Sequence, residues 1–262
     1  MLGAIADVVL RGPAAFHWDP ATTPLASIVS PCVASVAYLG AIGLLKRRTG
    51  PEVRSKPFEL LHNGLLVGWS LVVLLGTLYG AYQRVQEDGR GVQALLCTQR
   101  PPSQIWDGPV GYFTYLFYLA KYWELVDTVI LALRQKPTIP LHVYHHAVML
   151  FIVWSWFAHP WLEGSWWCSL VNSFIHTVMY SYYTLTVVGI NPWWKKWMTT
   201  MQIIQFITGC VYVTAFFGLY YAGAGCTSNV YTAWFSMGVN LSFLWLFALF
   251  FRRSYSKPSR KE

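Results

Sequence analysis

Three histidines stand within five residues of one another in a segment that is otherwise apolar. The segment reads "LHVYHHAVML", and its histidines are His142, His145 and His146. On a helix, positions i, i+3 and i+4 project to nearly the same side, so the three imidazoles are expected to share a face. Imidazole can ligate a metal, transfer a proton or accept an acyl group near neutral pH. One buried histidine is often a core residue, but three in this spacing indicate chemistry.

A second polar cluster, "KYWELVDT", interrupts the preceding apolar run. Lys121, Glu124 and Thr128 fall on one helical face, with Asp127 beside them. An ion pair between Lys121 and Glu124 would neutralise two charges and leave Asp127 without a partner. A charge at the middle of a bilayer costs about 2.5–3.5 kcal/mol, so these side chains are expected to face the protein interior.

Two later runs carry polar stripes at helical spacing. The first stripe, in "NSFIHTVMYSYY", consists of Asn172, His176, Tyr180 and Tyr183. The second, in "TTMQIIQF", consists of Thr199, Gln202 and Gln205. Tyrosines are typical of packing or interfaces, and interhelical hydrogen bonding also explains the glutamines. Four such faces on consecutive helices nevertheless predict one shared cavity.

The composition is that of a membrane protein. Of 262 residues, 55% are hydrophobic and only 11% are charged, whereas soluble domains carry about 25% charged residues. Apolar runs of a length that spans a bilayer occur at 25–45, 59–82, 112–133, 141–158, 166–188, 199–221 and 231–251. The fold class expected is therefore an all-α membrane protein with seven transmembrane helices. The net charge of +8 lies in short clusters between the runs, and no nucleic-acid motif is present.

The basic clusters predict an orientation. Most Lys and Arg residues fall in alternate connections and at the C-terminus, which the positive-inside rule places in the cytosol. We therefore expect a luminal N-terminal segment (1–24), a seven-span domain (25–251) and a basic cytosolic tail (252–262). Cys97 and Cys226 lie in two connections on the luminal side, where an oxidising environment allows a disulfide; two free thiols are the alternative.

A metal site is the main chemical alternative to a nucleophile. The H-x-x-H-H spacing resembles one histidine box of membrane desaturases and hydroxylases, in which several boxes hold two irons. The chain has seven histidines in all, and His17, His62 and His159 form no second box. A single zinc held by clustered histidines is a weaker alternative. We expect no metal and no cofactor.

Taken together, the motifs resemble those of the ELO family of fatty-acid elongases. K-x-x-E-x-x-D-T, H-x-x-H-H and T-x-x-Q-x-x-Q are all filled, and N-x-x-x-H-x-x-M-Y-x-Y-Y is matched from Asn172 to Tyr183, including Met179 and Tyr182. The resemblance covers about residues 25–255. It implies a tunnel for the acyl chain, enclosed by six helices with the first span outside.

The resemblance also implies a reaction. A long-chain acyl-CoA would condense with malonyl-CoA in the endoplasmic reticulum membrane, giving a 3-ketoacyl-CoA, CO₂ and CoA. We expect His145 to accept the acyl group and His176 to stabilise the oxyanion or assist decarboxylation. Asn172 and the glutamines are candidate oxyanion donors. Asp127 is a candidate for holding a histidine tautomer.

The remaining site residues are predicted to bind substrate. They are Lys121, Glu124, Thr128, Tyr180, Tyr183, Gln202 and Gln205, with Arg134, Lys136, Lys195, Lys196, Arg252 and Arg253 available for the phosphates of CoA. The basic residues are equally well explained as topology determinants. Pro137 stands where polyunsaturated-chain elongases often carry glutamine, which favours saturated or monounsaturated chains.

Other readings stay open at this point. The enolate of malonyl-CoA can attack the thioester directly in a ternary complex, without an acyl-imidazole. A seven-span receptor or channel, or a non-catalytic lipid-binding protein, has the same gross composition. Membrane lipid and the other enzymes of the elongation cycle are the expected partners, and the oligomeric state, a homo-oligomer included, is open.

Overall fold

Each of the seven apolar runs folds into one long helix. The computed structural model describes residues 1–255, and within that range its regular structure is all helical, without a strand. The long helices are α2 (Val29–Lys46), α3 (Lys56–Asp88), α5 (Pro109–Leu133), α6 (Pro140–Ala158), α7 (Leu162–Val187), α8 (Lys195–Tyr221) and α9 (Val230–Tyr255). Two shorter helices are α1 (Leu2–Arg11) and α4 (Gln93–Leu96), and 3-10 turns cover Pro13–Ala15 and Pro102–Gln104.

The predicted tail boundary falls inside the last helix. Arg252 and Arg253 belong to the final turn of α9. Residues 256–262 lie outside the described residues.

Local signals in the sequence set where the helices begin and end. Ser55 caps α3 by accepting a hydrogen bond from the backbone N–H of Phe58 at 3.4 Å. Gly89 ends this helix in the left-handed conformation, with φ 75°. Pro109 and Pro140 open α5 and α6, where their missing N–H would have no intrahelical partner.

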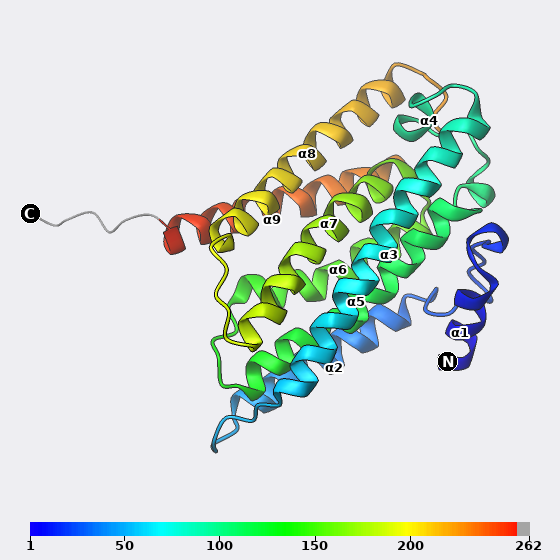
Figure 1. Cartoon of the computed structure of the whole chain (residues 1–262). Helices are drawn as coiled ribbons and strands as arrows, with labels where there is room; N and C mark the ends of the chain where they lie inside the picture. The colour runs from blue at the N-terminus through cyan, green and yellow to red at the C-terminus, as the bar shows by residue number, and fades with distance from the viewer. Residues whose placement is uncertain (256–262) are drawn as a thin grey trace, which may run out of the picture.

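Six long helices pack in a closed ring. α3 packs against α5, α5 against α6, α6 against α9, α9 against α8, α8 against α7, and α7 against α3. α2 lies outside this ring, against α5 and α6 (Figure 1). The ring therefore places α5, α6, α7 and α8, which carry the four polar clusters, around one interior.

Close approach of α3 and α5 depends on glycine. A Cβ on Gly80 would lie 2.7 Å from the backbone nitrogen of Val110, and one on Gly76 would lie 2.1 Å from the Phe113 ring. Small residues four apart commonly allow two membrane helices to pack this closely.

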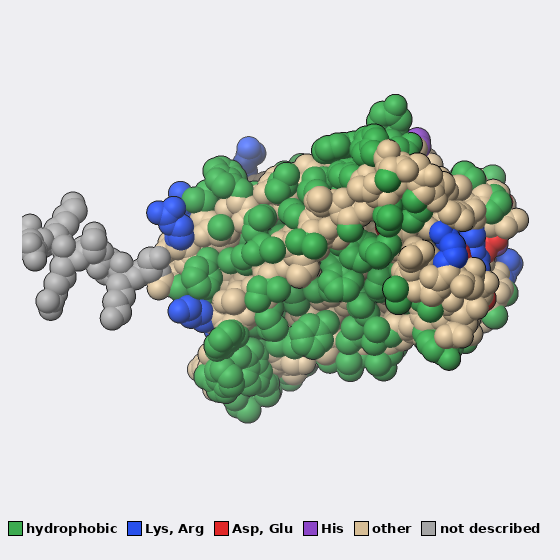
Figure 2. All heavy atoms as spheres, turned by 90° about the horizontal axis from the view of Figure 1, so that it is seen from above, with side chains coloured by type: hydrophobic (Ala, Val, Ile, Leu, Met, Phe, Trp, Pro, Cys, Tyr) green, Lys and Arg blue, Asp and Glu red, His purple; other side chains and the backbone are tan. Residues whose placement is uncertain are grey.

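The helices have the dimensions and composition of membrane spans. Within residues 1–255, α2, α3, α6, α8 and α9 are long and apolar enough to cross a bilayer. α5 and α7 have 25 and 26 residues but do not meet that standard, because both carry polar side chains. Figure 2 shows charged side chains gathered towards the two ends of the molecule and a hydrophobic flank between them. The chain is therefore a multi-pass membrane protein.

The segment before α2 contributes to the core, which the sequence did not indicate. Phe16 and Trp18 are buried. The Trp18 ring stacks on Phe157 with centroids 4.3 Å apart. Tyr112 of α5 also donates a hydrogen bond to the carbonyl of Val9 at 2.8 Å. These contacts fix one end of the ring.

The predicted disulfide between Cys97 and Cys226 is present. Beside it, Thr227 donates from its backbone nitrogen to the carbonyl of Thr98 at 2.9 Å and from its hydroxyl to that of Arg100 at 2.6 Å. The bridge thus ties the α3–α5 connection to the α8–α9 connection.

Removing this bridge should destabilise the fold. Replacing Cys97 and Cys226 together by serine is expected to cost about 2–4 kcal/mol, because a crosslink over a long loop restricts the unfolded chain. The two bridged cysteines are 129 residues apart in the sequence. Thermal unfolding in detergent measures the effect, with the Cys210→Ser variant as the matched control. Equal melting temperatures for the double variant and the wild type would show that the bridge does not stabilise the fold.

Candidate active site

The polar clusters on α5, α6, α7 and α8 meet at one cavity, which we call the polar cavity. It has a volume of about 240 Å³. Its polar lining residues are Asp127, His142, His145, His146, Asn172, His176, Tyr180, Tyr182, Tyr183, Lys195, Thr199, Gln202, Gln205 and Tyr255. The structure therefore gathers residues from all four predicted clusters.

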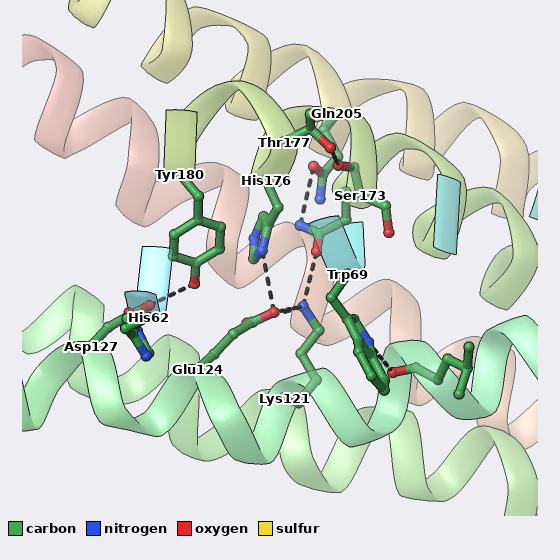
Figure 3. Close-up of polar contacts among 12 residues, drawn as sticks. His62, Trp69, Lys121, Glu124, Asp127, Ser173, His176, Thr177, Tyr180 and Gln205 are labelled. Carbon is green, nitrogen blue, oxygen red and sulfur yellow. Dashed lines mark hydrogen bonds and ion pairs between the residues drawn. The ribbon is translucent and has the colours of Figure 1, made fainter. Parts of the chain in front are cut away.

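A buried ion pair joins α5 to α7 beside this cavity. Lys121 Nζ lies 2.7 and 3.1 Å from the two carboxylate oxygens of Glu124 and donates to Asn172 Oδ1 at 3.0 Å. His176 Nδ1 lies 3.2 Å from Glu124 Oε1 (Figure 3). Lys121 and Glu124 are each only 2% exposed. Buried charges need such additional partners, because desolvation offsets much of their mutual attraction.

The ammonium group fixes the direction of the hydrogen bonds that follow. It can only donate, so the Asn172 atom facing it is the carbonyl oxygen. Asn172 Nδ2 then faces Gln205 Oε1 at 3.5 Å, which leaves the Nε2 hydrogens of Gln205 for another acceptor. The carboxylate of Glu124 accepts from His176 Nδ1, so Nε2 of neutral His176 carries the lone pair.

The three box histidines are not equivalent. His142 and His146 meet edge to face with ring centroids 4.5 Å apart, whereas His145 packs against Phe243 at 4.9 Å. Among the described residues, His142 Nε2 and His145 Nδ1 are buried without a hydrogen-bond partner. Unpaired buried polar atoms cost free energy, so two of them in one cavity indicate a ligand site.

A smaller cavity, which we call the apolar cavity, adjoins the polar cavity at His145. Its volume is about 60 Å³. The two cavities share His145, Asn172, Gln205 and Phe206. Beyond these shared residues the lining is mostly apolar and includes Trp156 and Trp161. His145 therefore stands at the junction of polar and apolar space.

His62 of α3 is a site residue that the sequence did not indicate. Its Nε2 lies 2.6 Å from Asp127 Oδ1, and Trp123 Nε1 donates to its Nδ1 at 3.1 Å. Asp127 Oδ2 accepts from the Tyr180 hydroxyl at 2.6 Å (Figure 3). Because the indole only donates, Nδ1 of His62 is the acceptor and its Nε2 carries the proton.

Asp127 was a candidate for holding a histidine tautomer, and the histidine that it contacts is His62. The side chain of His62 is fully buried. A lone histidine in an apolar run carries no signal of a partner on another helix.

The bond between His62 and Asp127 should be measurable as stability. His62→Leu leaves the Asp127 carboxylate with one donor fewer, which is expected to cost about 1–3 kcal/mol. His62→Gln keeps an N–H donor of similar reach and should cost less. Denaturant unfolding of both variants in detergent provides the comparison. Equal losses for the two variants would contradict the assigned hydrogen bond.

Thr128 faces away from the polar cavity. Its hydroxyl lies 2.8 Å from the Tyr38 hydroxyl of α2. It therefore connects α5 to the helix outside the ring rather than contacting a ligand in the cavity.

The predicted phosphate-binding residues are dispersed. Lys195 lines the polar cavity, whereas Arg134 pairs with Glu59 at 3.3 Å. Lys196 lies over the ring of Phe251, 5.7 Å from its centroid. Arg252 and Arg253 are exposed at the end of α9. Lys136 lies in the α5–α6 connection and lines a different hollow.

The metal-dependent alternative concerns how the possible ligands are grouped. Within residues 1–255, no three His, Cys, Asp or Glu side chains are grouped as ligands of one metal ion. Metal analysis of the purified protein separates this alternative from nucleophilic chemistry.

Fold and site together define a multi-pass membrane protein with a histidine-rich interior cavity. The chain belongs to the GNS1/SUR4 (ELO) family, whose sequence profile matches residues 23–262. This confirms the resemblance seen in the motifs.

Its relatives are similar over most of their length. "Fatty acid elongase sre1" of Dictyostelium discoideum is 42% identical, with 94% of this chain and 91% of the relative covered. "Fatty acid elongase A" of the same organism is 36% identical over 93% and 89%. "Very long chain fatty acid elongase 5" of Mus musculus is 31% identical over 86% and 74%. Family and relatives together support a role in fatty-acid elongation.

Proposed function

We propose that the protein is the condensing enzyme of fatty-acid elongation, a 3-oxoacyl-CoA synthase. It joins a long-chain acyl-CoA to malonyl-CoA and forms a 3-ketoacyl-CoA two carbons longer, CO₂ and free CoA. Family membership implies acyl-CoA substrates and membrane lipid. The observation that carries the condensation is the position of His145 where the polar and apolar cavities meet.

The two cavities match the two parts of an acyl-CoA in polarity. The pantetheine arm belongs in the polar cavity, with Lys195 available to a phosphate, and the first carbons of the hydrocarbon tail belong in the apolar cavity. The apolar cavity, at about 60 Å³, is smaller than a long acyl chain, so its lining side chains must move to admit the rest of the tail. The thioester carbonyl then lies at the junction, beside His145 and Gln205. Because Asn172 is turned by Lys121, the free Nε2–H group of Gln205 is the donor best placed for the oxyanion.

The first half-reaction is acyl transfer to His145. The unprotonated ring nitrogen attacks the thioester carbonyl, the tetrahedral intermediate expels the CoA thiolate, and the imidazolium proton passes to that leaving group. The products are N-acyl-His145 and CoA-SH. Division of one hard displacement into two easier steps is the usual benefit of a covalent intermediate.

The second half-reaction consumes malonyl-CoA. Loss of CO₂ leaves the enolate of acetyl-CoA, whose carbon attacks the acyl-imidazole and forms the new C–C bond. The released imidazolide takes up a proton, which restores neutral His145. His176, with Nδ1 on Glu124 and its Nε2 lone pair free, is positioned to manage protons in the polar cavity. No metal or organic cofactor takes part in either step.

The membrane arrangement proposed for this enzyme has seven spans. α5 and α7 cross the bilayer as members of the ring, with their polar faces turned towards its interior. In this arrangement the mouth of the polar cavity and the C-terminus face the cytosol and the disulfide faces the lumen of the endoplasmic reticulum, which the distribution of Lys and Arg supports. There the enzyme would supply its product to the reductases and dehydratase that complete elongation.

Product analysis tests the proposal directly. Purified protein is incubated with palmitoyl-CoA and malonyl-CoA carrying ¹⁴C in its free carboxyl group. The expected result is release of ¹⁴CO₂ that depends on palmitoyl-CoA, together with 3-ketostearoyl-CoA. Failure of the folded protein to form this ketoacyl product with any long-chain acyl-CoA would exclude a condensing enzyme.

Trp161 should limit the length of the acyl chain. This buried side chain lines the apolar cavity next to Gly164, where an added Cβ would come within 1.9 Å of the indole. Trp161→Ala enlarges the cavity and is expected to add one further round of elongation. Gly164→Ala pushes the indole into the cavity and should shorten the preferred chain. Mass spectrometry of products formed from acyl-CoAs of graded length measures both shifts, and shifts in the same direction would contradict the assignment.

A further inference from the structure

A hollow with basic walls lies between the end of α2 and the α5–α6 connection. Its volume is about 650 Å³, and its charged lining residues are Lys46, Arg48 and Lys136. Among residues 1–255 no Asp or Glu lines it, and it shares no lining residue with the polar cavity. We call it the α2 hollow.

We propose that the α2 hollow binds the phosphate-bearing headgroup of an anionic phospholipid. This function is additional to condensation and does not depend on it.

The charges in the hollow are not neutralised by the protein. Lys46, Arg48 and Lys136 form no ion pair among residues 1–255. The nearby carboxylate of Glu59 is already held by Arg54 and Arg134. Three cations beside one hollow therefore lack an anion.

Two residues that line the hollow also carry a buried polar atom without a hydrogen-bond partner among residues 1–255. The two atoms are Arg48 Nη1 and Thr138 Oγ1. The guanidinium group of Arg48 folds back over Gly50, where an added Cβ would lie 3.6 Å from Nη2. A phosphate can accept from both the guanidinium and the hydroxyl, and the planar guanidinium suits its paired oxygens. The positive-inside rule explains why basic residues lie in this connection, but it does not explain why these two buried atoms are unpaired.

The position of the hollow favours a lipid over a soluble phosphate. α2 lies outside the six-helix ring (Figure 1), and only 22% of its residues are buried. The hollow opens where α2 and α5 end, and Leu45 and Ala132 form apolar walls. Headgroup phosphates of a bilayer lie at the ends of spanning helices, and basic pockets there bind anionic lipids.

Native mass spectrometry of the purified full chain in detergent tests the site. The protein is titrated with dioleoyl phosphatidate and, separately, with dioleoyl phosphatidylcholine. We expect retained phosphatidate but little phosphatidylcholine, with about tenfold weaker phosphatidate binding in Arg48→Gln. Arg47→Gln is the matched control because Arg47 is exposed in the same connection and does not line the hollow. Thr138→Val should give a smaller loss in the same direction.

Three results would overturn the proposal. Equal losses in Arg47→Gln and Arg48→Gln would show diffuse attraction rather than a site. Equal retention of the two lipids would show no selectivity for the anionic headgroup. Binding of adenosine 3′,5′-bisphosphate or inorganic phosphate that requires Arg48, without phosphatidate binding, would assign the hollow to a soluble phosphate. Thermal unfolding without added phosphatidate confirms that each variant is folded.

Discussion

Replacing His145 by alanine is expected to reduce turnover at least about 10³-fold, because without the nucleophile the acyl-enzyme intermediate cannot form. His145 lines both cavities, and its Nδ1 has no hydrogen-bond partner among the described residues. Steady-state formation of 3-ketoacyl-CoA from acyl-CoA and malonyl-CoA measures the loss. His145→Gln keeps much of the side-chain volume and should be equally inactive.

Cys168 provides the control for this prediction. Cys168 lines the apolar cavity and carries a thiol, and the hydroxyl of Ser236, which also lines this cavity, accepts a hydrogen bond from Trp156 Nε1 at 3.0 Å. No base contacts the Cys168 thiol among the described residues, so Cys168→Ala should keep turnover within about twofold. Loss of activity in Cys168→Ala together with retained activity in His145→Gln would identify the Cys168 thiol, rather than the His145 imidazole, as the acyl acceptor.

The second large effect is expected at the ion pair of Lys121 and Glu124. Lys121→Met leaves a buried carboxylate without its ammonium partner, which should cost about 3–5 kcal/mol of folding free energy. His176 remains within 3.2 Å of this carboxylate and can offset part of the loss. Denaturant unfolding in detergent measures the change.

A double variant separates charge from packing. Lys121→Met combined with Glu124→Gln removes both charges while it keeps the side-chain volumes, so it should be more stable than either single variant. Its activity should stay low, because His176 loses the carboxylate that fixes its tautomer and Asn172 loses the ammonium that turns its amide. Additive stability losses would show that the two charges do not interact.

Much of this site follows from periodicity along single helices. The apolar runs predict the long helices within a few residues, because helix length and bilayer thickness constrain the same segments. The Lys121–Glu124 contact is predictable because residues three apart on a helix are neighbours. His145 was predicted as the acyl acceptor, and the structure places it between two cavities; its chemical role stays a prediction.

Contacts between distant helices could not be predicted. His62 meets Asp127 because α3 packs against α5. The sequence predicted that Arg134 could bind a phosphate, but in the structure Arg134 pairs with Glu59 of α3. Such contacts depend on how the helices pack against each other, and helix packing cannot be predicted from a local pattern in one sequence.

The orientation of each side-chain amide also could not be predicted from the sequence. The sequence left Asn172, Gln202 and Gln205 as equivalent oxyanion donors. Lys121 turns the Asn172 amide so that its nitrogen faces Gln205 Oε1, which leaves Gln205 Nε2 free. Gln202 lines only the polar cavity, whereas Gln205 lines both cavities. The orientation of the Asn172 amide arises from one ammonium group that can only donate.

Intact-protein mass spectrometry after incubation with palmitoyl-CoA alone tests the covalent mechanism most directly. We predict a mass increase equal to one palmitoyl group, absent from His145→Ala and discharged when malonyl-CoA is added. Formation of ketoacyl product by wild-type protein that never carries this adduct, even when quenched within a single turnover, would contradict an acyl-imidazole and require direct enolate attack on the bound thioester.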